Sequence, residues 1–243
     1  MEAQELTARQ QKLLKSIVEK YVETASPVGS ETLEREASLG VSPATLRNEM
    51  VKLTNLGILS QPHTSAGRIP TADGFRFYIN NLMDQKQLAV KDEVTIKEKL
   101  WDDRHERRRI LKDAAQALAD KTHALGVAMT SDDTYYSGLA NILDMPEFYD
   151  IDVTRTLLSM LDQTNQLVDI FFGRQDDLGV HVVFGTDLDD QFLQPCSFVY
   201  SRFSIGDGQG VVGVIGPSRL NYPAVIPTVR YLSNLMEELA PGW

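Results

Sequence analysis

The chain is poor in several of the residues and patterns that mark secreted and membrane proteins. Cys196 is the one cysteine among 243 residues, so no internal disulfide can form. It lies in the apolar run 196–200, which predicts a buried, unreactive thiol. No run of about 18 apolar residues exists, and no basic segment with a following apolar block opens the chain, so we expect no membrane span and no secretory signal. These absences predict a cytoplasmic protein.

Catalytic and metal-binding patterns are also lacking. No histidine pairs at metal-ligand spacing with another histidine or with the cysteine. The acidic pairs at 132–133, 176–177 and 189–190 lie beside turn residues and are typical of solvated loops. The glycine-rich segment 206–210 has neither a lysine nor a following helix, which favours a hairpin turn over a phosphate-binding loop. We therefore expect no enzyme activity, no metal and no cofactor. The four histidines are His63, His105, His123 and His181.

The charge is unevenly distributed along the chain. The net charge of −10 by itself argues against nucleic-acid binding. However, residues 1–84 hold 9 Lys and Arg against 10 Asp and Glu, which leaves a net charge of −9 for residues 85–243. Residues 42–76 carry a net charge of +2. A local basic patch on an acidic body favours local DNA binding, because the acidic body suppresses non-specific electrostatic binding.

Three helices are predicted in the first sixty residues. Apolar side chains recur at three- and four-residue steps over about residues 6–24, which predicts an amphipathic helix. A short helix capped by Ser30 follows a turn. A third helix begins after the N-cap Ser42, has Pro43 at its first position, and ends at Gly57. Short helices with tight glycine-containing turns are typical of a helix-turn-helix domain.

The third helix divides into a packing face and an outward face. Leu46, Met50 and Leu53 share one side and are predicted to pack on the other helices. Arginine can pair with guanine, asparagine with adenine, and small side chains with the thymine methyl group, and early residues of such a helix reach the bases. We therefore expect base contacts from Ala44, Thr45, Arg47 and Asn48 ahead of Lys52 and Asn55.

A β-hairpin is predicted directly after this helix. Residues 58–61 begin a strand, residues 63–68 form a polar tip, and residues 69–71 return. This arrangement is a winged helix. Arg68, beside Gly67 at the tip, is placed to contact phosphate or a minor groove. The candidate DNA-binding residues are Ser42, Ala44, Thr45, Arg47, Asn48, Lys52, His63, Thr64, Ser65, Gly67 and Arg68.

Other interpretations apply to the same residues. Three-helix modules with polar outer faces also bind proteins. Arg47 can form a surface salt bridge with Glu49 or Glu31, and a single histidine such as His63 is more often a turn residue than a contact. The combination of a helix-turn-helix with an arginine-bearing wing favours DNA binding over these readings.

The second half is predicted to be α+β. A long helix is expected over about residues 88–124, a strand at 124–129 and a helix capped by Asp150. Further strands are expected at 167–172, 180–184, 197–203 and 211–215, with a hairpin between the first two, and a final helix begins at Pro223. The basic run 104–109 is either a second DNA contact or a solvated helix face, and its interleaved acids favour the latter. An antiparallel sheet flanked by helices is the expected fold.

Several segments closely resemble the bacterial heat-inducible transcription repressor HrcA family. The resemblance implies a homodimeric repressor of chaperone genes that binds an inverted-repeat operator, with the chaperonin GroEL keeping it active. It also implies a winged helix joined to a GAF-like domain that carries an inserted dimerisation domain. The segments that carry the resemblance are 26–30, 42–50, 61–71, 74–78, 138–143 with 146–148, and 210–222.

The chain is shorter than the family pattern, and the shortage falls between Met129 and Tyr135. We therefore expect the inserted dimerisation domain to be absent and the sheet to lack early strands. The expected domains are a winged helix at 1–84, a helical linker or dimerisation helix at 85–124, and a shortened GAF-like domain at 125–243. Pairing would then use the 88–124 helix or an exposed sheet edge. Two alternatives remain open: a regulator that senses a ligand through the GAF-like half, and an interaction module that has lost operator binding.

Overall fold

The computed structural model describes residues 6–37, 40–84, 86–103, 106–173 and 179–240. The chain divides into two compact units, Met1–Asp84 and Gln85–Trp243. Each unit has its own buried apolar core, and each is described separately.

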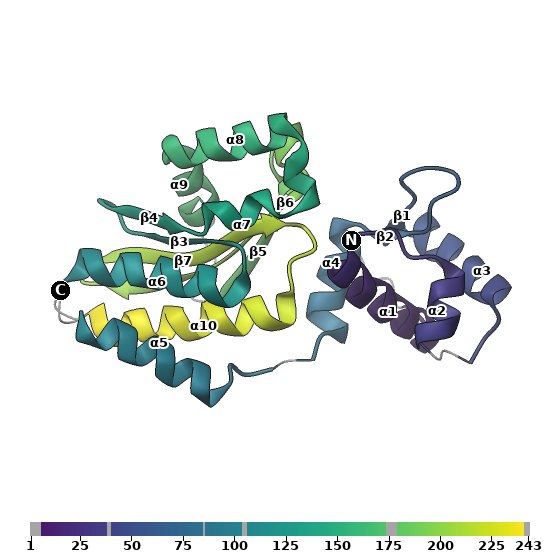
Figure 1. The fold of residues 1–243 in the computed structure, drawn as a ribbon, viewed down its shortest axis with the longest axis horizontal. Helices are drawn as coiled ribbons and strands as arrows, with labels where there is room; N and C mark the ends of the chain where they lie inside the picture. Colours follow the sequence, from purple (N-terminus) through teal and green to yellow (C-terminus); the bar gives the residue numbers. More distant parts are fainter. Residues whose placement is uncertain (1–5, 38–39, 85, 104–105, 174–178, 241–243) are drawn as a thin grey trace. The chain divides into compact units, whose positions relative to one another are not determined.

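Unit 1 begins with three helices (Figure 1). They are α1 (Ala8–Thr24), α2 (Ser30–Ala37) and α3 (Pro43–Asn55). Thr7 and Gln10 form the capping box of α1, while the Ser42 hydroxyl accepts the Thr45 N–H at the start of α3. Ser30, expected as a cap, is instead the first residue of α2 and is buried. The α1–α3 arrangement confirms the predicted helix-turn-helix.

A short wing follows α3. Strands β1 (Leu59–Ser60) and β2 (Ile69–Pro70) pair antiparallel, with Leu59 opposite Pro70. Helix α4 (Ala72–Phe77) begins after the N-cap Thr71 and continues into a π-helical turn at Tyr78–Leu82. Unit 1 is therefore a winged helix, as predicted.

Unit 2 contains a five-stranded antiparallel sheet in the order β4-β3-β7-β6-β5 (Figure 1). The hairpin between β6 and β7 turns at Gly206, whose positive φ of 54° suits glycine. Residues 206–207 form the turn and residues 208–210 begin β7, so the segment forms a hairpin, as the sequence indicated. The strands are β3 (Leu125–Met129), β4 (Thr134–Ser137), β5 (Val180–Phe184), β6 (Cys196–Ile205) and β7 (Gly208–Pro217).

Helices cover both faces of this sheet (Figure 1). On one face lie α6 (Arg107–Thr122) and α10 (Tyr222–Leu239), with α5 (Val90–Asp102) against them. Across the sheet lie α7 (Leu139–Leu143), α8 (Ile151–Asp162) and α9 (Asn165–Phe172). Apolar side chains of α8 and α9 pack with alternate residues of β3, β6 and β7. The α+β fold with an antiparallel sheet is confirmed.

Two expectations for the second half were wrong, and one strand was not predicted. Residues 167–172 form helix α9 and not a strand, so no hairpin joins them to β5. The helix expected over 88–124 is two helices, α5 and α6, with Asp103 as the C-cap of the first. Strand β4, between the predicted deletion site and Gly138, was not foreseen.

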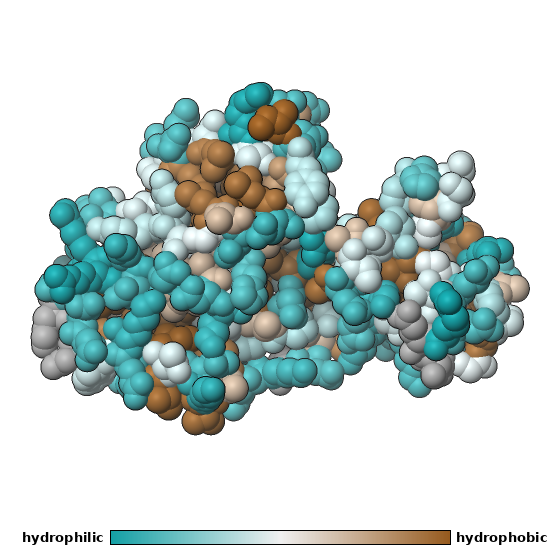
Figure 2. Space-filling model, in the orientation of Figure 1, coloured by the Kyte–Doolittle hydropathy of each residue, from teal (hydrophilic) through white to brown (hydrophobic). Residues whose placement is uncertain are grey.

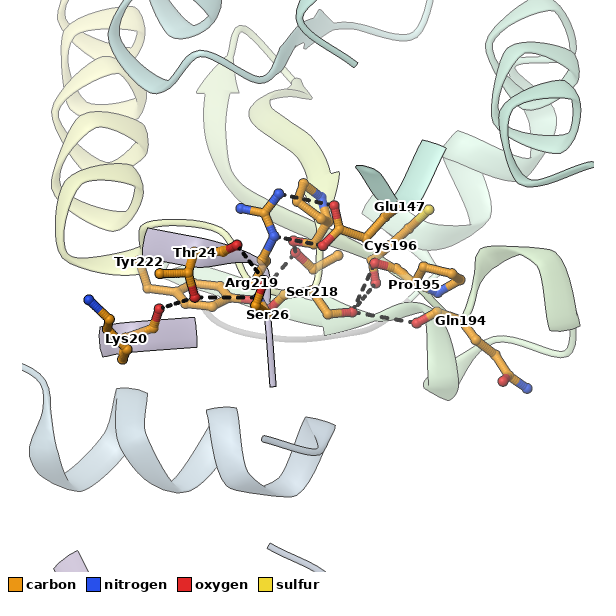
Figure 3. A network of polar contacts seen from close by, with 12 residues as sticks. Lys20, Thr24, Ser26, Glu147, Gln194, Pro195, Cys196, Ser218, Arg219 and Tyr222 are labelled. Carbon is orange, nitrogen blue, oxygen red and sulfur yellow. Dashed lines mark hydrogen bonds and ion pairs between the residues drawn. The ribbon is translucent and has the colours of Figure 1, made fainter. Parts of the chain in front are cut away.

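A partly buried polar network joins Ser218 and Arg219, just before α10, to the start of β6 and to the 3-10 turn at Pro146–Tyr149 (Figure 3). The Arg219 guanidinium donates to both carboxylate oxygens of Glu147, at 2.6 and 3.0 Å, and both side chains are largely buried. Ser218 donates to the carbonyls of Pro195 and Cys196. Burial raises the pKa of the Cys196 thiol to about 12, which agrees with the predicted unreactive cysteine.

The described residues contain no helix long and apolar enough to cross a bilayer. Nor do they contain a group of three His, Cys, Asp or Glu side chains placed to hold a metal ion.

Candidate nucleic-acid interface

Helix α3 presents one polar face to solvent and packs the opposite face into unit 1. Leu46, Met50 and Leu53 are buried, as the sequence predicted. Ala44, Arg47 and Asn48 are exposed near the helix start. Arg47 makes no salt bridge with any residue that the structure describes. The two partners considered from the sequence, Glu49 and Glu31, therefore do not pair with its guanidinium.

The other candidates on α3 are engaged within the domain. The Thr45 hydroxyl lies 3.0 Å from the Ser42 hydroxyl, and both shape the start of the helix. Lys52 donates to the Glu49 carboxylate at 2.8 Å, and Gln10 donates to its other oxygen at 3.2 Å. The Lys52 hydrogen bond, opposed by burial, lowers the pKa of Glu49. The free groups at the start of α3 are therefore those of Ala44, Arg47 and Asn48.

Arg68 does not stand at the tip of the wing, which corrects the sequence-based placement. Its backbone pairs with Val28 through two hydrogen bonds of 2.9 Å, which join the base of the wing to the turn before α2. The Arg68 Nε donates to the Thr54 hydroxyl at 3.0 Å, and the side chain is half-buried. The guanidinium is thus held against α3.

The exposed tip of the wing is formed by His63, Thr64 and Ser65. Its shape is fixed locally, because the Gln61 amide donates to the carbonyls of Thr64 and Ala66 at 3.0 Å. His63 Nδ1 lies 3.2 Å from the Ser65 hydroxyl. These three side chains are the wing groups most available to a backbone phosphate.

Gly67 is needed where the wing meets the turn before α2. A Cβ atom at this position would overlap the carbonyl oxygen of Val28. Gly67 therefore allows a close backbone approach that a larger residue would prevent, and its contact with DNA stays a prediction.

A groove of about 570 Å³ lies between α2, α3 and the wing. Arg35, Arg47 and Arg68 line it, together with Glu31 and the backbone at Gly29. Arg35 was not among the predicted site residues. The sequence signal that could have found it is a basic residue in the last turn of a helix otherwise rich in glutamate.

The basic run at the start of α6 is neutralised by carboxylates. Arg107 donates to Asp132 and Asp133, Arg108 pairs with Asp133, and Arg109 pairs with Asp103 and Glu106. Residues 104 and 105 lie outside the described part of the chain, as does the acidic pair 176–177. The described arginines of this run therefore fit the solvated-face interpretation better than a second DNA contact.

Comparison with known proteins matches both parts of the chain to one family. Residues 5–89 match the family described as winged helix-turn-helix transcription repressor, HrcA DNA-binding, and residues 71–226 match the HrcA protein C terminal domain. A heat-inducible transcription repressor HrcA of Desulforamulus reducens is 27% identical, with 96% of this chain and 98% of that protein covered. The protein of the same name from Carboxydothermus hydrogenoformans is 26% identical, with coverages of 95% and 97%.

A solved structure described as a hypothetical protein has the same fold. Its TM-score is 0.81 at 20% identity, and the match covers 98% of this chain and 100% of that one. The alignment with the Desulforamulus protein runs over 340 positions, whereas this chain has 243 residues, so at least 97 of those positions have no counterpart here.

Proposed function

The chain belongs to the HrcA family, and from that premise we propose that it is a DNA-binding transcription repressor of heat-shock genes, acting in the cytoplasm without catalysis. The observation that carries the proposal is the exposed start of α3, where Arg47 and Asn48 project from a helix whose opposite face is buried. The relatives named heat-inducible transcription repressors support the same role.

In the proposed complex the first half of α3 enters the major groove. Arg47 pairs with guanine and Asn48 with adenine, while Ala44 lies against a thymine methyl group. The wing tip, at His63 to Ser65, contacts the sugar-phosphate backbone, which fixes orientation and carries no sequence information directly.

Tight binding requires two copies of the winged helix on one operator. The basic patch at 42–76 carries a net charge of only +2, within a chain of net charge −10. Two copies would read the half-sites of an inverted repeat, about 10 base pairs or a multiple apart. In unit 2, α5 exposes Val90, Val94 and Trp101, and β4 is an edge strand of the sheet, so both surfaces that the sequence indicated for pairing are available.

Fluorescence anisotropy tests this proposal. The duplex is one selected by the protein from a random-sequence pool, and the comparison is the same duplex with scrambled order. We expect tighter binding to the selected duplex by a factor of about 10³ or more at physiological salt. Equal affinity for both duplexes would refute operator recognition and would favour the interaction-module alternative.

We also propose the chaperonin GroEL as a partner, on family resemblance alone. Size-exclusion chromatography of the two proteins together measures it directly. Separate elution at micromolar concentration, with no effect of GroEL on operator binding, would argue against this partner.

A further inference from the structure

Three arginine side chains that no carboxylate neutralises line one groove of unit 1. Within the described residues, Arg35, Arg47 and Arg68 form no salt bridge with aspartate or glutamate. Glu31, which lines the same groove, is not paired with any of them. Gathering like charges without partners is unfavourable in the free protein, so this arrangement suits an anion that binds between them.

Several other arginines of the chain form salt bridges with nearby carboxylates. Arg76 pairs with Asp73 at 2.8 Å, Arg155 with Asp152 at 2.6 Å, and Arg219 with Glu147. Arg9 and Arg230 also lack a salt bridge with any described residue, so what distinguishes the groove arginines is that three of them line one groove.

One groove arginine is held in a fixed orientation. The Arg68 Nε donates to the Thr54 hydroxyl at 3.0 Å, and that hydroxyl donates to the Met50 carbonyl at 2.9 Å. The contact uses Nε and leaves the two terminal nitrogens of the guanidinium without a partner among the described residues. A guanidinium held in this way is prepared for an oxyanion, since less side-chain freedom is lost on binding.

We propose that this groove holds a backbone phosphate of the bound DNA duplex, with Arg35 and Arg68 as its ligands and Thr54 as the positioning residue for Arg68. The inference rests on the proposed function. A duplex is favoured over a small anion because the groove, at about 570 Å³, far exceeds one phosphate, and because Arg47 of the exposed face of α3 lines it too. A DNA strand that passes α3 would therefore run along this groove.

The salt dependence of binding tests the role of Arg35. Each neutralised phosphate contributes about 0.9 to the slope of log affinity against log salt. We expect Arg35→Gln to reduce the slope by about 0.9 and to weaken binding to the selected and scrambled duplexes by the same factor. Arg35→Lys should keep the slope. The matched control is Arg230→Gln, which removes one positive charge from an exposed position of α10 and should leave the slope unchanged.

The outcomes separate this inference from the function on which it rests. If the parent protein does not prefer the selected duplex, the proposed function fails. If the parent does prefer it but Arg35→Gln keeps the full salt slope, only the phosphate groove is overturned. Replacing chloride by inorganic phosphate at equal ionic strength tests for a small-anion site. Thermal stabilisation of the parent but not of Arg35→Gln, together with an unchanged salt slope for Arg35→Gln, would assign the groove to free phosphate and would overturn the DNA assignment.

The test of Thr54 must distinguish positioning of Arg68 from a general contribution to stability. Thr54→Val keeps the side-chain shape but removes the acceptor for Arg68. We expect affinity for both duplexes to fall several-fold while the thermal midpoint changes little, and Thr54→Ser to restore affinity. A loss that serine does not rescue, or a loss in an Arg68→Ala background as large as in the parent, would exclude the positioning role.

Discussion

Asn48 carries an amide that can both donate to and accept from the edge of adenine, and its side chain is exposed on α3. We expect Asn48→Ala to cost about 1–3 kcal/mol in binding at one base step of the operator. Anisotropy titrations on duplexes with that step changed one base pair at a time measure the effect. Asn55→Ala, exposed at the other end of α3, serves as the control. An equal loss on every sequence would contradict a base contact.

The buried hydroxyl of Tyr200 has no hydrogen-bond partner among the residues that the structure describes. Its ring packs against Phe171 with centroids 5.0 Å apart and against His181 at 5.2 Å. An unsatisfied buried hydroxyl costs about 1–3 kcal/mol, so we expect Tyr200→Phe to raise the free energy of unfolding by an amount of that order.

Chemical denaturation measures the Tyr200 effect, and Tyr222→Phe is a matched control. The Tyr222 hydroxyl donates to the Ser218 carbonyl at 2.7 Å, so its removal should destabilise the protein. Destabilisation by both substitutions would mean that the Tyr200 hydroxyl is satisfied in solution.

Among the secondary-structure elements, α3 is fastened to α1 through a carboxylate that titrates. The pKa of Glu49 is lowered below its ordinary value of 4.5 by the hydrogen bond from Lys52, with a further contribution from Gln10. Because the folded-state pKa is the lower one, the stabilisation is fully present above about pH 4.5 and is lost as the pH falls through the folded-state pKa.

Glu49→Gln should therefore weaken the loss of stability on acidification in that pH window. Urea denaturation at a series of pH values measures it. Glu34→Gln, at an exposed position of α2, is the control and should follow the parent protein. If Glu49→Gln also follows the parent, the carboxylate does not link stability to pH.

Periodicity and cap residues predicted α1 and α3 well but misassigned α9. The caps at Thr7 and Ser42 are local signals, since each side chain binds a backbone group three residues away. The run 167–172 is apolar except for Asp169, and such short runs do not distinguish a strand from a helix by pattern. In the structure Leu167, Ile170 and Phe171 are buried while Val168 is 41% exposed, a helical spacing that packing decides.

The candidate site was predictable in its residue types but not in all its positions. The exposed face of α3 follows from helical geometry alone. Arg68 was expected at the wing tip, yet its backbone pairs with Val28, forty residues earlier in the chain. Arg35 has a local signal, as a basic residue in the last turn of α2, but that signal does not show that the groove brings together three segments distant in sequence. Long-range contacts of this kind leave no local pattern.

On the scale of the whole molecule, the number of chains on the operator is the decisive quantity. Apolar side chains gather on the surface of unit 2 over α7 to α9 (Figure 2), where Leu143, Ile151, Leu158 and Val168 are exposed. A large exposed apolar patch often marks an interaction surface.

We expect light scattering to find two chains per operator duplex, and the half-site spacing of about 10 base pairs to follow from that pairing.

The matched comparison for this measurement is a duplex with one half-site scrambled, which should bind far more weakly. A single chain that binds the intact and the half-scrambled duplex equally well would contradict paired recognition. That result would not contradict the contacts proposed for a single winged helix.

The backbone pairing of Val28 with Arg68 has a mechanical consequence for the DNA. It joins the wing to the turn before α2, and the Arg68 side chain joins it to Thr54 of α3, so we expect the spacing of the wing and α3 to be kept on duplexes of different width. The duplex must then adapt its own groove width, at a cost that depends on the stiffness of base steps that no side chain touches. We expect substitutions at such uncontacted steps, from flexible to rigid sequences, to change operator affinity. If these substitutions do not change operator affinity, then the wing, and not the DNA, adapts its position.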